Sequence, residues 1–132
     1  MTTIQRQKEP VQTRTTSKSS LDGIRLAAED LYSAISDAAV LRHEHAKVRL
    51  VSVAPKPAVI VAAIRAVLAA HTELAQNHLT EAVVLLEETE AQLTVSAKTT
   101  GVAFHTAVRQ ALANSRSAVR KVGAVVASTR WT

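Results

Sequence analysis

Basic side chains near the C-terminal end are the residues whose type and spacing most clearly suggest chemistry. On a helix that turns ~100° per residue, Lys98, Arg109, Arg116 and Arg120 fall within about 40° of one another. Guanidinium groups in such a row match the phosphates of a nucleic-acid backbone, where contacts give affinity without reading the base sequence. A solvated helix face is the simpler interpretation, because no groove-reading motif or aromatic stacking platform accompanies the row.

Charge is unevenly distributed along the 132 residues, whose formal net charge is +5. No acidic residue follows Glu90, whereas residues 21–90 hold ten acidic and six basic residues. Three glutamates in that region form an acidic stripe, so the arginines could instead pair with them within one chain or between subunits. A site for nucleic acid or for an acidic protein surface would comprise these predicted polyanion-binding residues: Arg6, Arg14, Arg109, Arg116, Arg120 and Lys121.

Five histidines are present, and none of them is spaced like a metal ligand. His71 and His78 are seven residues apart, which separates them by roughly 10 Å along a helix and is too far for one ion. His43 and His45 flank a glutamate, but helix positions one and two apart do not face each other. We therefore interpret His71, His78 and His105 as core or interface side chains, and we expect neither a metal nor a cofactor.

Catalytic motifs are absent from the sequence. The chain has no cysteine, which excludes thiolate chemistry, and its three glycines do not form a phosphate-binding loop. No paired-carboxylate motif, nucleophile elbow or zinc motif occurs either. We expect a non-enzymatic protein without catalytic residues.

Helical periodicity covers most of the chain after residue 20. Residues 1–20 are polar and basic without any periodicity, so we expect a flexible basic arm there. Helices are predicted from Leu21 to about Ala46, from Pro57 to about Val95, and from residue 99 or 100 to about Ser128. The predicted fold class is all-α: a three- or four-helix bundle with long antiparallel helices, forming one domain over residues 21–132.

Two stretches in the middle of the chain allow alternatives. Residues 48–53 partly alternate between apolar and polar side chains, which allows a short extended crossover before Pro55. Residues 77–80 allow a break in the second predicted helix, because Thr80 and Glu81 resemble a fresh helix start. One apolar stripe runs through them, however, and favours a single long helix.

The kind of apolar residue predicts self-association. Apolar residues make up 47% of the chain but aromatic residues only 2%, and most of the apolar set is alanine, valine or leucine. Small side chains bury little area per helix, so a monomer would have a thin core that a second subunit could complete. The predicted self-association residues of this homo-oligomer are Ile64, Val67, Leu85, Val108, Leu112 and Val119.

These features predict a structural or assembly protein, in outline like small virion proteins that carry a basic arm before a helical domain. The alternative is a nucleic-acid-binding module that uses the arm and the C-terminal arginines. A membrane-surface role for the cationic last helix is a weaker alternative, because its apolar side is valine and alanine. The longest apolar run, Ala58 to Ile64, is shorter than a membrane span, and no secretory signal is recognised. We therefore expect a cytoplasmic protein or a component of an assembled particle, without integral membrane association.

Overall fold

The protein is all-α, as the periodicity predicts. A computed structural model describes the backbone of residues 2–130 and the side chains of residues 21–128, and it holds no strand within residues 2–130. The elements in chain order are α1 (Thr2–Ala39), α2 (His43–Val53), α3 (Lys56–Val67), the short 3-10 helix η1 (Leu68–Ala70), α4 (Glu73–Ala97) and α5 (Gly101–Arg130).

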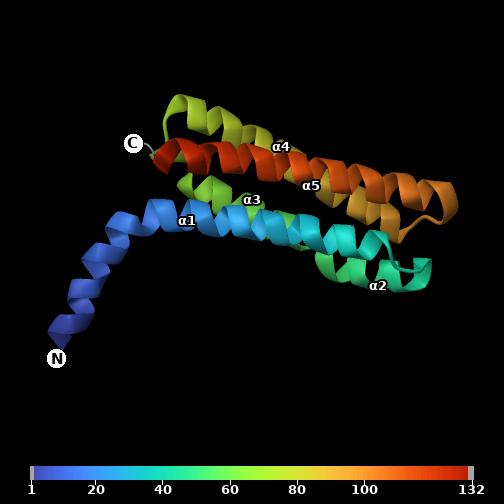
Figure 1. Cartoon of the computed structure of the whole chain (residues 1–132), viewed down its shortest axis with the longest axis horizontal. Coiled ribbons are helices and arrows are strands. Elements are labelled where there is room, and N and C mark those ends of the chain that lie inside the picture. Colours follow the sequence, from blue (N-terminus) through green and yellow to red (C-terminus); the bar gives the residue numbers. More distant parts are fainter. Residues whose placement is uncertain (1, 131–132) are drawn as a thin grey trace.

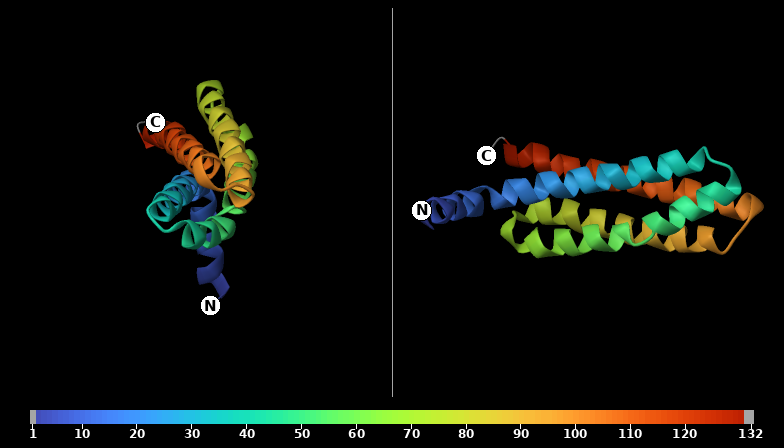
Figure 2. Two further views of the ribbon diagram at one scale, coloured as in Figure 1. Left: turned by 90° about the vertical axis from the view of Figure 1, so that its right-hand side faces the viewer. Right: turned by 90° about the horizontal axis from the view of Figure 1, so that it is seen from below.

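The helices are arranged as four rods that lie side by side, with α2 and α3 together forming the second rod (Figure 1). Helices that are neighbours in sequence also pack together: α1 contacts α2, α3 contacts α4, and α4 contacts α5. The last rod, α5, packs against both α4 and α1, and the α2–α3 rod completes the ring between α1 and α4. An end-on view shows α5 and the α2–α3 rod diagonally across from each other (Figure 2).

The N-terminal segment differs from the expected irregular arm. Residues 2–20 are helical and continue directly into the rest of α1, and Figure 1 shows them projecting away from the other helices. Extending an existing helix adds one hydrogen bond per residue without a new nucleation step, so a polar segment can follow the apolar one. Helix therefore begins well before Leu21, where the sequence placed it.

The first connection comes earlier than predicted. The first helix ends at Ala39 instead of Ala46, and Arg42 is extended (ψ 151°) before α2 begins at His43. The expected extended crossover at residues 48–53 is wrong, because these residues are helical. Ala46, Leu50 and Val53 are buried at steps of four and three residues, so the helical period outweighs the strand preference of β-branched side chains.

The predicted single helix from Pro57 to Val95 is also wrong. Helix α3 ends at Val67, His71 is extended (φ −111°, ψ 163°), and Thr72 caps α4 by accepting a hydrogen bond from the Ala75 amide at 3.3 Å. The break therefore lies at residues 71–72 and not at residues 77–80. The apolar stripe continues across it because α3 and α4 both bury a face in the same core.

The core lies between the rods and is made mainly of leucine, isoleucine, valine and alanine. Large side chains that are fully buried come from every rod, including Leu31 of α1, Ile64 of α3, Leu86 of α4 and Val122 of α5. Phe104 is buried in the first turns of α5, where its ring meets the edge of His43 with centroids 4.4 Å apart. This contact joins the α1–α2 connection to the start of α5.

Candidate functional site

Helix α3 exposes several apolar residues to solvent in addition to those it buries in the core. Ala58, Val59, Ala62 and Ala66 are exposed, and 68% of Val59 is accessible. Lys56 and Arg65 are also exposed on this helix, so its surface is only partly apolar. The exposed apolar residues of α3, here called its exposed face, are therefore a candidate surface for a partner.

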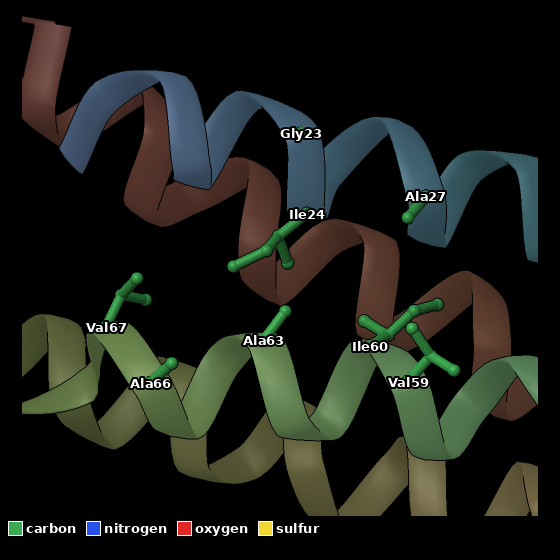
Figure 3. Close-up of a pocket in the computed structure, with 8 residues that line it drawn as sticks. All are labelled: Gly23, Ile24, Ala27, Val59, Ile60, Ala63, Ala66 and Val67. Carbon is green, nitrogen blue, oxygen red and sulfur yellow. The ribbon is translucent and has the colours of Figure 1, made fainter. Parts of the chain in front are cut away.

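A groove between α1 and α3 borders this face (Figure 3). Its volume is about 320 Å³, and all of its lining side chains are apolar. In Figure 3, Ile24 points from α1 towards α3, and Ala63 and Val67 point back from α3. The lining residues are Gly23, Ile24, Ala27, Val59, Ile60, Ala63, Ala66 and Val67.

None of the described residues requires Gly23 to be glycine. It lies in the interior of α1, where glycine costs roughly 0.5–1 kcal/mol relative to alanine. A Cβ atom added at Gly23 would meet nothing within 4 Å, so no described neighbour requires the missing side chain.

The α2–α3 rod also has the composition of a membrane span. His43–Ala70 is long and apolar enough to cross a membrane by length and composition, although core helices of soluble proteins share these properties. In the structure it is α2, α3 and η1, with a turn at residues 54–55. The sequence-based expectation of no integral membrane association stays a prediction.

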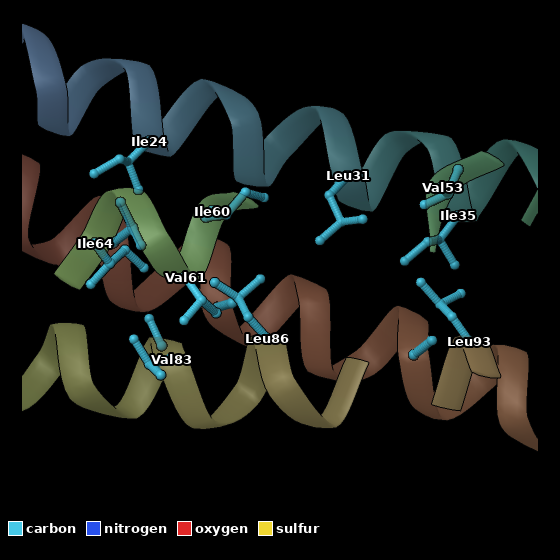
Figure 4. Packing of buried hydrophobic residues seen from close by; sticks show 14 of the residues in the cluster. Ile24, Leu31, Ile35, Val53, Ile60, Val61, Ile64, Val83, Leu86 and Leu93 are labelled. Carbon is cyan, nitrogen blue, oxygen red and sulfur yellow. The ribbon is translucent and has the colours of Figure 1, made fainter. Parts of the chain in front are cut away.

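The predicted self-association residues occupy two kinds of position. Ile64 and Val108 are buried in the core of a single chain, so they are not free to contact a partner. Figure 4 shows Ile64 and Val61 of α3 pointing into the space between α1 and α4. The other four residues are partly buried: Val67, Leu85, Leu112 and Val119. Of all six, only Val67 lines the groove.

The predicted polyanion-binding residues also separate into groups. Arg109, Arg116 and Arg120 are exposed on α5, and none of them has a carboxylate within 4.0 Å among the described side chains. Lys121 turns towards α4 instead and is bound to Glu81. Arg6 lies outside the residues whose side chains are described, as does Arg14.

Two acidic residues of α4 are matched by bases within the chain. Lys121 Nζ lies 2.8 Å from Glu81 Oε1, and Arg65 Nη2 of α3 lies 3.2 Å from Glu87 Oε2. The hydrogen bond from Lys121 and the charge of its ammonium group lower the pKa of Glu81 below its ordinary value, and the nearby His78 adds a smaller effect. Of the three glutamates in the predicted acidic stripe, Glu73, Glu87 and Glu88, only Glu87 has an ion pair among the described residues, and its partner is Arg65 and not an exposed arginine of α5.

The histidines occupy three places, and His43 and His105 contact the same ring, that of Phe104. His43 packs on Phe104, His71 lies in the α3–α4 connection, and His78 Nδ1 is 3.9 Å from Glu81 Oε1. His105 is exposed beside Phe104, with ring centroids 5.4 Å apart. Within the described part of the chain, no three His, Asp or Glu side chains gather where they could hold a metal ion.

The exposed α3 face was missed by reasoning from the sequence, although its signal is present. Between Glu44 and Glu73 there is no acidic residue, and residues 57–70 contain Arg65 as their only polar or charged residue. Comparisons with protein-family models, with curated proteins and with solved structures found no match to this chain. Its function is therefore inferred from its own surfaces.

Proposed function

We propose that this chain is a non-enzymatic assembly protein whose antiparallel helical bundle pairs with a second copy of itself through α3. The observation that carries this proposal is the exposed apolar face of α3 beside an open apolar groove. In a two-fold arrangement, α3 of each copy would occupy the α1–α3 groove of the other, so that one surface serves both subunits.

The shape of the surface favours a helix over a lipid layer as its partner. Helices that lie on membranes insert bulky side chains such as Trp, Phe and Leu. Gly23, Ala27, Ala63 and Ala66 offer little to insert, but they let a second helix backbone approach closely. A concave groove is also filled by the ridge of a helix better than by a flat surface.

Charge is compatible with the same pairing. Arg65 is held against α4 by Glu87, which leaves Lys56 as the other charged residue on α3. Asp30 follows Ala27 by three residues on α1 and is exposed, with no ion pair among the described residues. A carboxylate beside the groove of one copy is a suitable partner for Lys56 of the other.

The test is the molar mass in solution, measured by light scattering after size-exclusion chromatography. The wild-type chain is expected to have at least twice the mass of one chain. The V59E/A66E variant places two carboxylates on the exposed α3 face and should be a folded monomer, because burying unpaired charges is costly. The matched control V84E/A91E adds the same charges, with the same spacing, at exposed positions of α4 and should remain associated.

Two results would contradict the proposal. One is a monomeric wild-type chain at concentrations of tens of micromolar, and the other is equal loss of mass in V59E/A66E and in its control. If the monomeric wild-type chain floats with vesicles and V59E/A66E does not, the α3 face binds lipid instead. Circular dichroism of each variant shows whether the helices persist.

This proposal also sets the expected location. A chain that associates through its own surface and needs no cofactor suits the cytoplasm or the interior of an assembled particle. Fractionation of cells or particles that contain the protein, followed by detection with an antibody, checks this expectation. Recovery in the membrane fraction after a high-salt wash would contradict it.

A further inference from the structure

We propose that Arg109, Arg116 and Arg120 of α5, here called the arginine row, bind the phosphate backbone of double-stranded nucleic acid. The row lies on α5, diagonally across from the α2–α3 rod, so it is separate from the face proposed for self-association (Figure 2). The two proposals can fail independently of each other.

Among the described side chains, the arginine row has no acidic partner. All three residues are exposed, and no Asp or Glu occurs anywhere in Gly101–Arg130. Three other bases form ion pairs: Arg25 with Glu29 at 3.1 Å, Arg65 with Glu87 at 3.2 Å and Lys121 with Glu81 at 2.8 Å. Arg42, Lys47, Arg49, Lys56 and Lys98 form no ion pair among the described residues, but within the described side chains of α5 the uncompensated charge is that of the arginine row.

The spacing of the row suits a repeating anion. At 1.5 Å per residue, the Cα atoms of Arg109 and Arg116 are ~10 Å apart along α5, and Arg120 follows ~6 Å further on. The whole row spans roughly 16 Å, which corresponds to about five base pairs of a duplex. Ala113 lies on the same exposed face between the first two arginines, and its small side chain does not hold a backbone away.

The side-chain chemistry favours phosphate and a duplex. A guanidinium group donates two parallel hydrogen bonds to a phosphate and stays charged at any physiological pH. Non-specific binding to single strands relies on aromatic side chains that stack with bases. Within residues 21–128 no exposed aromatic side chain accompanies the row, because Phe104 is buried and Tyr32 is half-buried on α1. Contacts that are made only to the backbone are consistent with a duplex held without base readout.

The experiment measures binding of the full chain to a fluorescent DNA duplex of about 24 base pairs by anisotropy over a range of salt concentrations. The R109Q/R116Q/R120Q variant should bind at least ~10-fold more weakly at low salt, and the slope of log affinity against log salt should fall by about 2.7. The control R42Q/K47Q/R49Q removes the same charge from exposed or half-buried residues of α2 and the residue just before it, away from α3. It should keep most of the affinity.

Three outcomes would overturn the inference. The first is that the wild-type chain does not bind the duplex at low salt. The second is that the two triple variants lose affinity equally, which would show that only the net charge of the protein matters. The third is that polyglutamate displaces the duplex at equal charge concentration, which would indicate an acidic protein as the partner. Light scattering of R109Q/R116Q/R120Q should show an unchanged mass, so loss of duplex binding is distinguishable from loss of self-association.

Discussion

The ammonium group of Lys121 on α5 lies 2.8 Å from a carboxylate oxygen of Glu81 on α4. This ion pair connects the two helices that share the most extensive packing in the protein. It also removes Lys121 from the surface available to a polyanion, since its charge is matched within the chain.

Replacing Lys121 by methionine should raise the pKa of Glu81 towards its ordinary value, because the hydrogen bond and the positive charge that lower it are lost. A carboxylate whose pKa is lowered by folding stabilises the native state above its unfolded pKa, and this contribution disappears as pH falls through the folded pKa. K121M should therefore be less stable than wild type near neutral pH and indistinguishable from it in acid. NMR titration of the Glu81 carboxyl carbon measures the pKa, and an unchanged value in K121M would show that the ion pair is absent in solution.

Two glycines should respond to alanine in opposite directions. Gly123 is inside α5 and has open space at the Cβ position, so G123A should raise the free energy of unfolding by ~0.5–1 kcal/mol. Gly101 has a positive φ of 61° at the α4–α5 connection, where an L side chain is strained. G101A should therefore lower the free energy of unfolding by about 1 kcal/mol. Urea denaturation measures both, and a change of the same sign in the two variants would contradict the description of this connection.

Leu86 and Leu74 test the position of the core within α4. Leu86 is completely buried, whereas 66% of Leu74 is accessible on the same helix. L86A should lower the free energy of unfolding by ~2–5 kcal/mol, because it removes buried methyl groups and leaves a cavity. L74A should change it by less than about 0.5 kcal/mol. If the two variants unfolded at the same denaturant concentration, the assigned face of α4 would be wrong.

The all-α class and the buried face of α1 could be predicted from the sequence, because apolar residues recur at three- and four-residue steps. Ile24, Leu31 and Ile35 of α1 are buried as that pattern requires. The ends of α1 and α3 could not be predicted from the sequence. The connection after each of these helices contains no glycine or proline that would mark a break. Tertiary packing determines where these helices end. Because the chain turns between α3 and α4, the apolar residues of both helices are buried in one core, which a single straight helix would not allow.

The candidate surfaces were only partly predictable for a related reason. Helical spacing places Arg109, Arg116 and Arg120 on one face, and all three are exposed on α5; Lys98, predicted to lie in the same row, instead ends α4 before the chain turns. Spacing does not say which rods are neighbours, so the pairing of Lys121 with Glu81 was not foreseen. Nor does it separate an apolar residue that fills the core of one chain, such as Val108, from one that remains exposed, such as Val59.

Cysteine cross-linking tests the central claim, pairing through α3, most directly, because the chain has no cysteine of its own. Single variants A62C and A66C place one thiol on the exposed α3 face, and A91C places one on the exposed face of α4 as a control. A disulfide forms only where two Cα atoms come within about 7 Å. The account predicts that mild oxidation yields covalent dimers of A62C or A66C well above the level seen with A91C. Equal cross-linking of all three variants, or none on α3, would contradict it.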